Sequence, residues 1–246
     1  METDGLKAGQ SGCQTPAEPV AWTGLDAVGV LVTWFMLQFV VGVFANFLGL
    51  RMDDPLVSAG LLPVPFVMLI VLTVVWVRTK GAGALSQLRG RRRPTWGDVA
   101  AGIVYGLIGA VVITSIGLGL QLLLESFGQQ LPPVQEGLRE LVTGPAAPIA
   151  IITVTGLAPL AEELLYRGML FQGLQARFGF WPAAMASGIV FGLVHVELLV
   201  AVLTAVLGVY LAWLFRRRGT ILAPILAHAV FNAISFVLIR MSPPLG

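Results

Sequence analysis

The sequence predicts an all-α polytopic membrane protein with about seven transmembrane helices. Two observations support this fold class. Of the 246 residues, 57% are hydrophobic and only 11% are charged, whereas a soluble domain carries about 25% charged residues. The apolar residues also gather in runs near the length of about 20 residues that a helix needs to cross a bilayer. This composition therefore excludes an ordinary soluble domain.

Seven apolar segments account for the predicted helices. They lie at residues 22–49, 57–78, 97–124, 146–174, 181–196, 198–215 and 221–240. The fifth and sixth could be read as one helix over 181–215, but that stretch is too long for a single span of about 20 residues. The charge pattern favours a break near His195-Val196-Glu197.

Basic residues follow the second, fourth and sixth predicted helices. They are Arg78, Lys80, Arg89, Arg91, Arg92, Arg93, Arg177, Arg216, Arg217 and Arg218. With seven helices, these three loops fall on one side of the membrane. The positive-inside rule then predicts a cytoplasmic N-terminus and places the C-terminus outside. Because the arginines lie at segment ends and not on one polar face, we expect no nucleic-acid partner.

Few features stand out between the predicted spans. Residues 133–143, PVQEGLRELVT, have apolar side chains on one helical face and charges opposite, which fits either a short amphipathic helix on the outer surface or an ordinary loop. Residues 1–21 lack the basic-then-apolar order of a signal peptide, so we expect the first span to be a retained anchor. The lone Cys13 cannot form an internal disulfide.

The most informative stretch is LAPLAEELLYRGMLFQGL, residues 157–174, because it carries charges inside a predicted span. Glu163 and Arg167 are four residues apart, so on a helix they share a face and can pair. Glu162 points about 100° away and has no obvious partner on its own helix. Pro159 removes a backbone donor and permits a bend. Charges at such depth are costly and mark a functional site.

Both histidines of the chain lie in apolar helices with a second motif residue one turn away. Phe191 precedes His195 by four residues, and Asn232 follows His228 by four. Glu162 and His195 come out roughly 18–21 Å from the predicted cytoplasmic helix ends, and His228 and Asn232 roughly 10–16 Å. These depths are compatible with one shared pocket.

Such a pocket has the groups needed for amide hydrolysis with water as the nucleophile. A carboxylate and a neutral imidazole can hold and deprotonate a water molecule. A second histidine and an asparagine amide can donate hydrogen bonds to a developing oxyanion. Glu162, His195 and His228 could instead hold zinc with an open position for water, although the H-E-x-x-H motif is absent. The residue spacing leaves both alternatives open.

Three motifs in this order, E-E-x-x-x-R, F-x-x-x-H and H-x-x-x-N, resemble those of the CPBP family. These are the CAAX-prenyl-protease and bacteriocin-processing proteins, also called the Abi family. The arginine-rich turn and the stretch GTILAPILAH before the last motif are also similar to the family. The resemblance covers roughly residues 95–240.

The resemblance implies an intramembrane endopeptidase with an all-helical fold and a conical cavity open to the cytoplasm. The substrate would be a membrane-associated peptide or lipidated protein, with a prenylated CAAX-like tail or a leader peptide as candidates. The family is often described as metalloproteases, but the Glu/His mechanism requires no cofactor; zinc is the alternative. The alanine-, glycine-, leucine- and valine-rich composition with few lysines favours a bacterial plasma membrane.

The resemblance also assigns roles to individual residues. Glu162 would be the base that activates water, and His195 would orient that water. His228 and Asn232 would form the oxyanion hole. Structural support of the site would come from Glu163, Arg167 and Phe191.

We expect the chain to divide into four parts, of which only the catalytic core rests on the resemblance. They are a polar cytoplasmic tail at 1–21, two N-terminal helices with a basic loop at 22–94, a CPBP-like catalytic core at 95–240 and a tail at 241–246.

Two other functions remain open. The same fold could serve as a catalytically silent membrane scaffold or immunity protein, in which case its function would survive Glu162→Gln. A proton- or ion-coupled transporter would also place carboxylates in the membrane. We find no repeat between the two halves of the sequence and no pair of matching broken helices, which disfavours the transporter.

Overall fold

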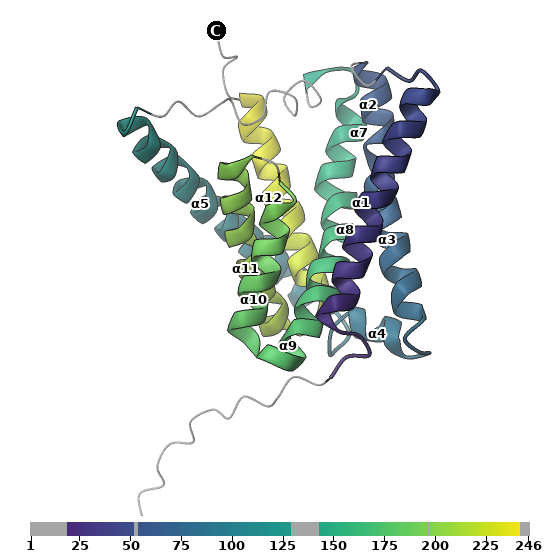
Figure 1. Ribbon diagram of the computed structural model, residues 1–246. Helices are drawn as coiled ribbons and strands as arrows, with labels where there is room; N and C mark the ends of the chain where they lie inside the picture. Colours follow the sequence, from purple (N-terminus) through teal and green to yellow (C-terminus); the bar gives the residue numbers. More distant parts are fainter. Residues whose placement is uncertain (1–18, 52–53, 129–142, 196, 242–246) are drawn as a thin grey trace, which may run out of the picture.

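Figure 1 shows the computed structural model, which describes residues 19–51, 54–128, 143–195 and 197–241. Every regular element in these ranges is helical. The elements are α1 (Gly24–Phe47), α2 (Pro55–Leu61), α3 (Pro63–Arg78), α4 (Ala84–Leu88), α5 (Trp96–Ser126), α7 (Ala147–Ile152), the π-helix η1 (Thr153–Leu157), α8 (Ala158–Glu163), the π-helix η2 (Leu164–Phe171), α9 (Gln172–Phe178), α10 (Phe180–Leu193), α11 (Leu198–Arg218) and α12 (Leu222–Met241).

Each predicted segment corresponds to a helix, which confirms the fold class. Within the described ranges, six helices are long and apolar enough to cross a membrane, and the chain is an integral membrane protein. The predicted helix at 181–196 is an exception in length. It is α10, which has 14 residues, fewer than the roughly 20 that a span needs. It ends early because the chain turns where the His195 N–H donates to Gly192 O at 2.9 Å.

The predicted break between the fifth and sixth helices is confirmed. α10 ends at Leu193, and α11 begins at Leu198 with Glu197 in extended conformation as its N-cap. The single predicted helix at 57–78 is divided, because Pro63 begins α3 directly after α2.

Two of the spans begin with the same local sequence, T-x-x-D. Asp26 Oδ2 accepts a hydrogen bond from the Thr23 N–H at 2.8 Å at the start of α1. Asp98 Oδ2 accepts from the Thr95 N–H at 2.8 Å at the start of α5. These contacts form capping boxes, which satisfy backbone donors that a helix start otherwise leaves unpaired.

Glycines allow two helix pairs to pack at very short distances. A Cβ atom at Gly106 of α5 would lie 2.8 Å from the Ala227 carbonyl oxygen of α12, and Gly102 faces the same helix one turn earlier. A Cβ atom at Gly208 of α11 would lie 2.7 Å from the Gly188 Cα of α10. Small residues at such spacing let membrane helices approach closely, and they fix α12, which carries His228, and α10, which ends two residues before His195.

The helices form two groups, and α5 runs obliquely behind one of them (Figure 1). α1, α3 and α8 lie side by side, and α10, α11 and α12 form the other group. α5 packs on α11 and α12, but its C-terminal end stands apart from the bundle.

The three basic loops lie at the same end of the bundle, as the sequence predicts. Arg92 of the loop after α3 and Arg218 at the end of α11 both bind Asp98. Arg216 stacks on Phe180, close to the α9–α10 turn. We call this the basic end. That it faces the cytoplasm, that the N-terminus is cytoplasmic and that the membrane is bacterial stay predictions.

Several predictions concern residues outside the described ranges. The amphipathic segment at 133–143 lies almost entirely there, as do Cys13, most of the tail at 1–21 and most of the tail at 241–246. The division of the chain into four parts also stays a prediction.

Candidate active site

The site is built on the helical rod from Ala147 to Phe178, which changes register twice. The π-helices η1 and η2 flank the short α8, whose last two residues are Glu162 and Glu163. π-helical turns inside α-helices are rare and frequently occur at functional sites. Both glutamates therefore lie between two changes of helical register.

Glu163 and Arg167 form the predicted pair, and it is completely buried. Arg167 Nη1 lies 2.8 Å from Glu163 Oε1, and both side chains are 0% exposed. Arg167 Nη2 donates to the Gly208 carbonyl of α11 at 3.1 Å. The guanidinium also lies over the Phe191 ring, 4.8 Å from its centre. The pair therefore joins the rod to α10 and α11.

His228 of α12 links the two glutamates. Its Nδ1 lies 3.0 Å from Glu163 Oε1, and its Nε2 lies 3.7 Å from Glu162 Oε2. An ionised carboxylate only accepts hydrogen bonds, so the Nδ1 proton points to Glu163. The Nε2 atom then faces Glu162 at a distance too long for a direct hydrogen bond but suited to one bridging water.

The adjacent glutamates thus have different surroundings. The Glu162 side chain is 18% exposed, whereas Glu163 is fully buried beneath it. Glu162 is the carboxylate that a substrate or water can reach.

Phe191 brings the second histidine to the same place. The His195 Nδ1 donates to the Phe191 carbonyl at 3.1 Å, because a carbonyl can only accept. The Phe191 ring centre lies 5.4 Å from that of His195 and 5.7 Å from that of His228, edge to face in both pairs. The structure therefore gathers both histidines around the buried pair.

Asn232 has a partner that the sequence analysis did not identify. In η1 the Ala158 N–H donates to Thr153 O, five residues before it. The next donor in this register would be residue 159, but proline has no N–H. The carbonyl left over is that of Val154, and Asn232 Nδ2 donates to it at 2.8 Å. An amide nitrogen carries two N–H groups, so the second remains for other acceptors.

This geometry makes a prediction for Asn232→Ala. The Val154 carbonyl would lose its partner, which should cost about 1–3 kcal/mol of folding free energy. Pro159→Ala supplies a backbone N–H, so the loss on Asn232→Ala should be smaller in that background. Wild type, Asn232→Ala, Pro159→Ala and the double variant are unfolded in detergent. Their four free energies of unfolding give the coupling between the two positions.

Ser235→Ala is the matched control, because Ser235 lies on the same helix and, among the described residues, its hydroxyl bonds only to Phe231 O of that helix. An equal loss for Asn232→Ala with and without Pro159 would show that Asn232 does not replace the missing proline donor.

The sequence analysis did not identify three further contacts of the site. Two of them involve backbone carbonyls, which no side chain marks in the sequence. These are the carbonyl oxygens of Val154 and Gly208 and the ring of Tyr166, which packs edge-on against Phe191 at 4.9 Å between ring centres. Only Val154 had a sequence signal, the proline five residues later. Ser187 of α10 donates to the Tyr166 carbonyl of η2 at 3.2 Å.

The alternative zinc site is not assembled by these contacts. Within the described residues, no three His, Cys, Asp or Glu side chains form a group that could hold a metal ion. Glu162, His195 and His228 are all among these residues. The His228 Nδ1 contact with Glu163 leaves Nε2 available, an arrangement that metal-bound histidines also show, so zinc binding stays a prediction.

Fold and site together define a polytopic membrane protein with a buried carboxylate–imidazole centre. Residues 144–234 match the family described as type II CAAX prenyl endopeptidase Rce1-like. The chain is 33% identical over 99 residues to a putative membrane peptidase, YdiL, of Bacillus subtilis, covering 40% of each protein. It is 30% identical over 100 residues to human CAAX prenyl protease 2, covering 32% of this chain and 30% of that protein.

Residues 144–234 are therefore similar to an Rce1-like domain, which confirms the predicted family resemblance. All the predicted site residues lie inside it. The matches support a membrane peptidase. The chain spans less than half the length of the curated relatives it matches. No solved structure matches it significantly.

Proposed function

We propose that the protein is an intramembrane endopeptidase that hydrolyses a peptide bond of a membrane-associated peptide, with Glu162 as the base. The observation that carries the proposal is the contrast between two neighbouring carboxylates. Glu163 is sealed in an ion pair, while Glu162 is partly exposed and lies 3.7 Å from an imidazole nitrogen of His228. One carboxylate serves the structure, and the other remains for chemistry.

In the proposed reaction, a water molecule is held between the Glu162 carboxylate and the Nε2 atom of His228. Glu162 accepts a proton as the water oxygen bonds to the carbonyl carbon of the scissile peptide. The carbonyl oxygen gains the negative charge and needs hydrogen-bond donors. Glu162 then returns the proton to the amide nitrogen as the C–N bond breaks. The products are a carboxylate and an amine.

The contacts of His228 constrain how the supporting roles are divided. With its Nδ1 proton directed to Glu163, a neutral His228 offers only a lone pair at Nε2. In that form it can hold the water beside Glu162 but cannot donate to an oxyanion. Oxyanion donation by His228 requires the doubly protonated ring. The second N–H of Asn232 can donate in either case, and His195 keeps the water-orienting role proposed from its motif.

The substrate class is proposed from the relatives. The human relative is named a CAAX prenyl protease, so a prenylated CAAX-like peptide is the first candidate. A leader peptide is the second. The apolar surroundings of the site suit a substrate anchored in the bilayer by a lipid or a helix.

The test is cleavage of a quenched-fluorescent farnesylated CAAX peptide by the purified protein in detergent, with and without a strong chelator. The matched control is the same peptide without the farnesyl group. We expect cleavage that the chelator does not affect. Loss on chelation with recovery on adding zinc would replace the metal-free mechanism by metal ligation. Absence of cleavage for prenylated and leader peptides alike would favour the scaffold or immunity function.

A further inference from the structure

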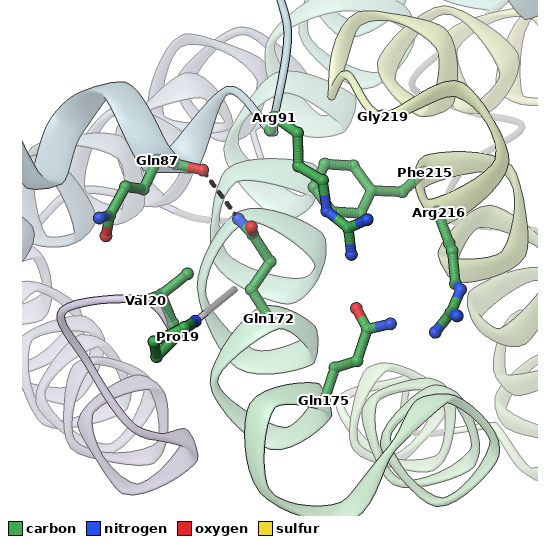
Figure 2. Close-up of a pocket in the computed structure, with 10 residues that line it drawn as sticks. Pro19, Val20, Gln87, Arg91, Gln172, Gln175, Phe215, Arg216 and Gly219 are labelled. Atoms are coloured by element: carbon green, nitrogen blue, oxygen red, sulfur yellow. Dashed lines mark hydrogen bonds between the residues drawn. The ribbon is translucent and has the colours of Figure 1, made fainter. Parts of the chain in front are cut away.

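A polar cavity lies at the basic end of the bundle, outside the site described above. Figure 2 shows this pocket, which has a volume of about 80 Å³ and is walled by the loop after α4, by α9 and by the end of α11. By the same measure one water needs about 10–15 Å³, so a group of several atoms fits. None of the predicted catalytic residues lines it.

The side chains that line the pocket carry positive charge and no negative charge. Of the ten lining residues, two are arginines, three are glutamines and none is acidic. In Figure 2 the side chains of Arg91, Arg216 and Gln175 point toward the same space. Asp98, a buried carboxylate of this end, is already bound by Arg92 and Arg218.

Gln175 is the second observation that indicates a ligand. The residue is only 6% exposed, and its amide nitrogen has no hydrogen-bond partner among the residues that the structure describes. Buried polar groups in proteins are nearly always hydrogen-bonded, so such a donor calls for an acceptor. The Gln175 amide lies beside the guanidinium groups of Arg91 and Arg216, which also only donate hydrogen bonds. The pocket therefore presents donors and positive charge to one point.

The wall that carries Arg91 is held rigidly by backbone contacts. The Arg91 N–H donates to Gly219 O at 2.9 Å, and the Ile221 N–H donates to Arg89 O at 2.9 Å. Gly90 has a φ of +98°, and a Cβ atom there would lie 2.6 Å from Gly219 O, so only glycine fits. The pocket is thus formed before any ligand arrives.

We propose that this pocket binds a phosphate group, supplied by the headgroup of an anionic phospholipid. Guanidinium groups match phosphate oxygens in charge and geometry. The exposed Trp96 and Trp181 lie at the same end and are typical of the membrane interface, where headgroups are found. Basic pockets between transmembrane helices bind such headgroups. Inorganic phosphate has the same chemistry and is the alternative source.

The test uses the full chain, stripped of lipid in detergent, with phosphatidylglycerol, phosphatidylcholine of the same acyl chains and inorganic phosphate as separate probes. Dissociation constants and unfolding temperatures are measured for each. We expect phosphatidylglycerol to bind and stabilise the protein more than phosphatidylcholine does. Arg91→Gln should weaken that binding about tenfold or more, since it removes charge-assisted hydrogen bonds.

Arg93→Gln is the matched control, because Arg93 is an exposed arginine two residues away that does not line the pocket. It should change the dissociation constant less than about twofold. Gln175→Met keeps the shape of the side chain, and it should weaken binding while leaving the ligand-free protein at least as stable as wild type.

The outcomes distinguish a phospholipid headgroup from inorganic phosphate as the ligand. Binding of inorganic phosphate that depends on Arg91, without a lipid preference, would assign the pocket to soluble phosphate. Equal effects of Arg91→Gln and Arg93→Gln, or no effect of either, would overturn the proposal, because the attraction would then come from general surface charge.

Discussion

Glu162→Gln is expected to abolish peptide cleavage while the protein stays folded and inserted. Glutamine has nearly the same shape and can still hydrogen bond to a water beside His228, but it cannot accept a proton. General base catalysis contributes roughly a hundred- to ten-thousandfold to rate, so the residual rate should fall at least that far. The rate of cleavage of the farnesylated peptide and the unfolding temperature of the same preparation measure both parts of the prediction.

Glu125→Gln provides the matched control for this substitution. Glu125 is an exposed glutamate at the far end of α5, and among the described residues its side chain bonds only to Gln121. Its substitution removes the same charge and should leave the cleavage rate unchanged. Normal processing by Glu162→Gln would exclude Glu162 as the base and favour the scaffold function.

Arg167→Met is expected to destabilise the fold strongly. It would leave the fully buried Glu163 carboxylate without its cation and the Gly208 carbonyl without its donor. Removing one partner of a buried ion pair costs about 3–5 kcal/mol. Denaturant titration of the detergent-solubilised protein measures the loss of folding free energy. Activity should fall as well, because a smaller fraction of the protein is folded.

Two further variants show whether the uncompensated charge causes this loss. Glu163→Gln combined with Arg167→Met removes both charges and should recover part of the stability, because no carboxylate is then left unpaired. Arg177→Met, at an exposed arginine of the same helical rod, should change stability by less than about 1 kcal/mol. If Arg167→Met were as stable as wild type, the pair would have no structural role.

The membrane fold could be predicted from the sequence because it depends on local properties. Apolar length places each helix, and the T-x-x-D capping boxes begin α1 and α5. The spacing of four between Glu163 and Arg167 predicts their pairing, since side chains one turn apart meet even without tertiary contacts. The glycines of α5 and α11 likewise predict close packing.

The length of α10 and the partner of Asn232 could not be predicted in the same way. An apolar run does not reveal where a helix ends when the chain turns at His195. The two π-helical segments depend on neighbouring helices that satisfy displaced carbonyls, as Asn232 does for Val154. Such backbone acceptors have no side-chain signature.

By itself the sequence determined the fold class, the end of the bundle that carries the basic loops and the identity of the polar residues inside the membrane. Only the tertiary structure decided which of two adjacent glutamates is reachable. Local sequence pairs Glu163 with Arg167 and leaves Glu162 unpaired on its own helix, but it does not give the burial of either side chain. The difference arises from His228, which binds Glu163 through Nδ1 and faces Glu162 through Nε2. Burial depends on what packs against a residue, and here those neighbours come from helices distant in the chain.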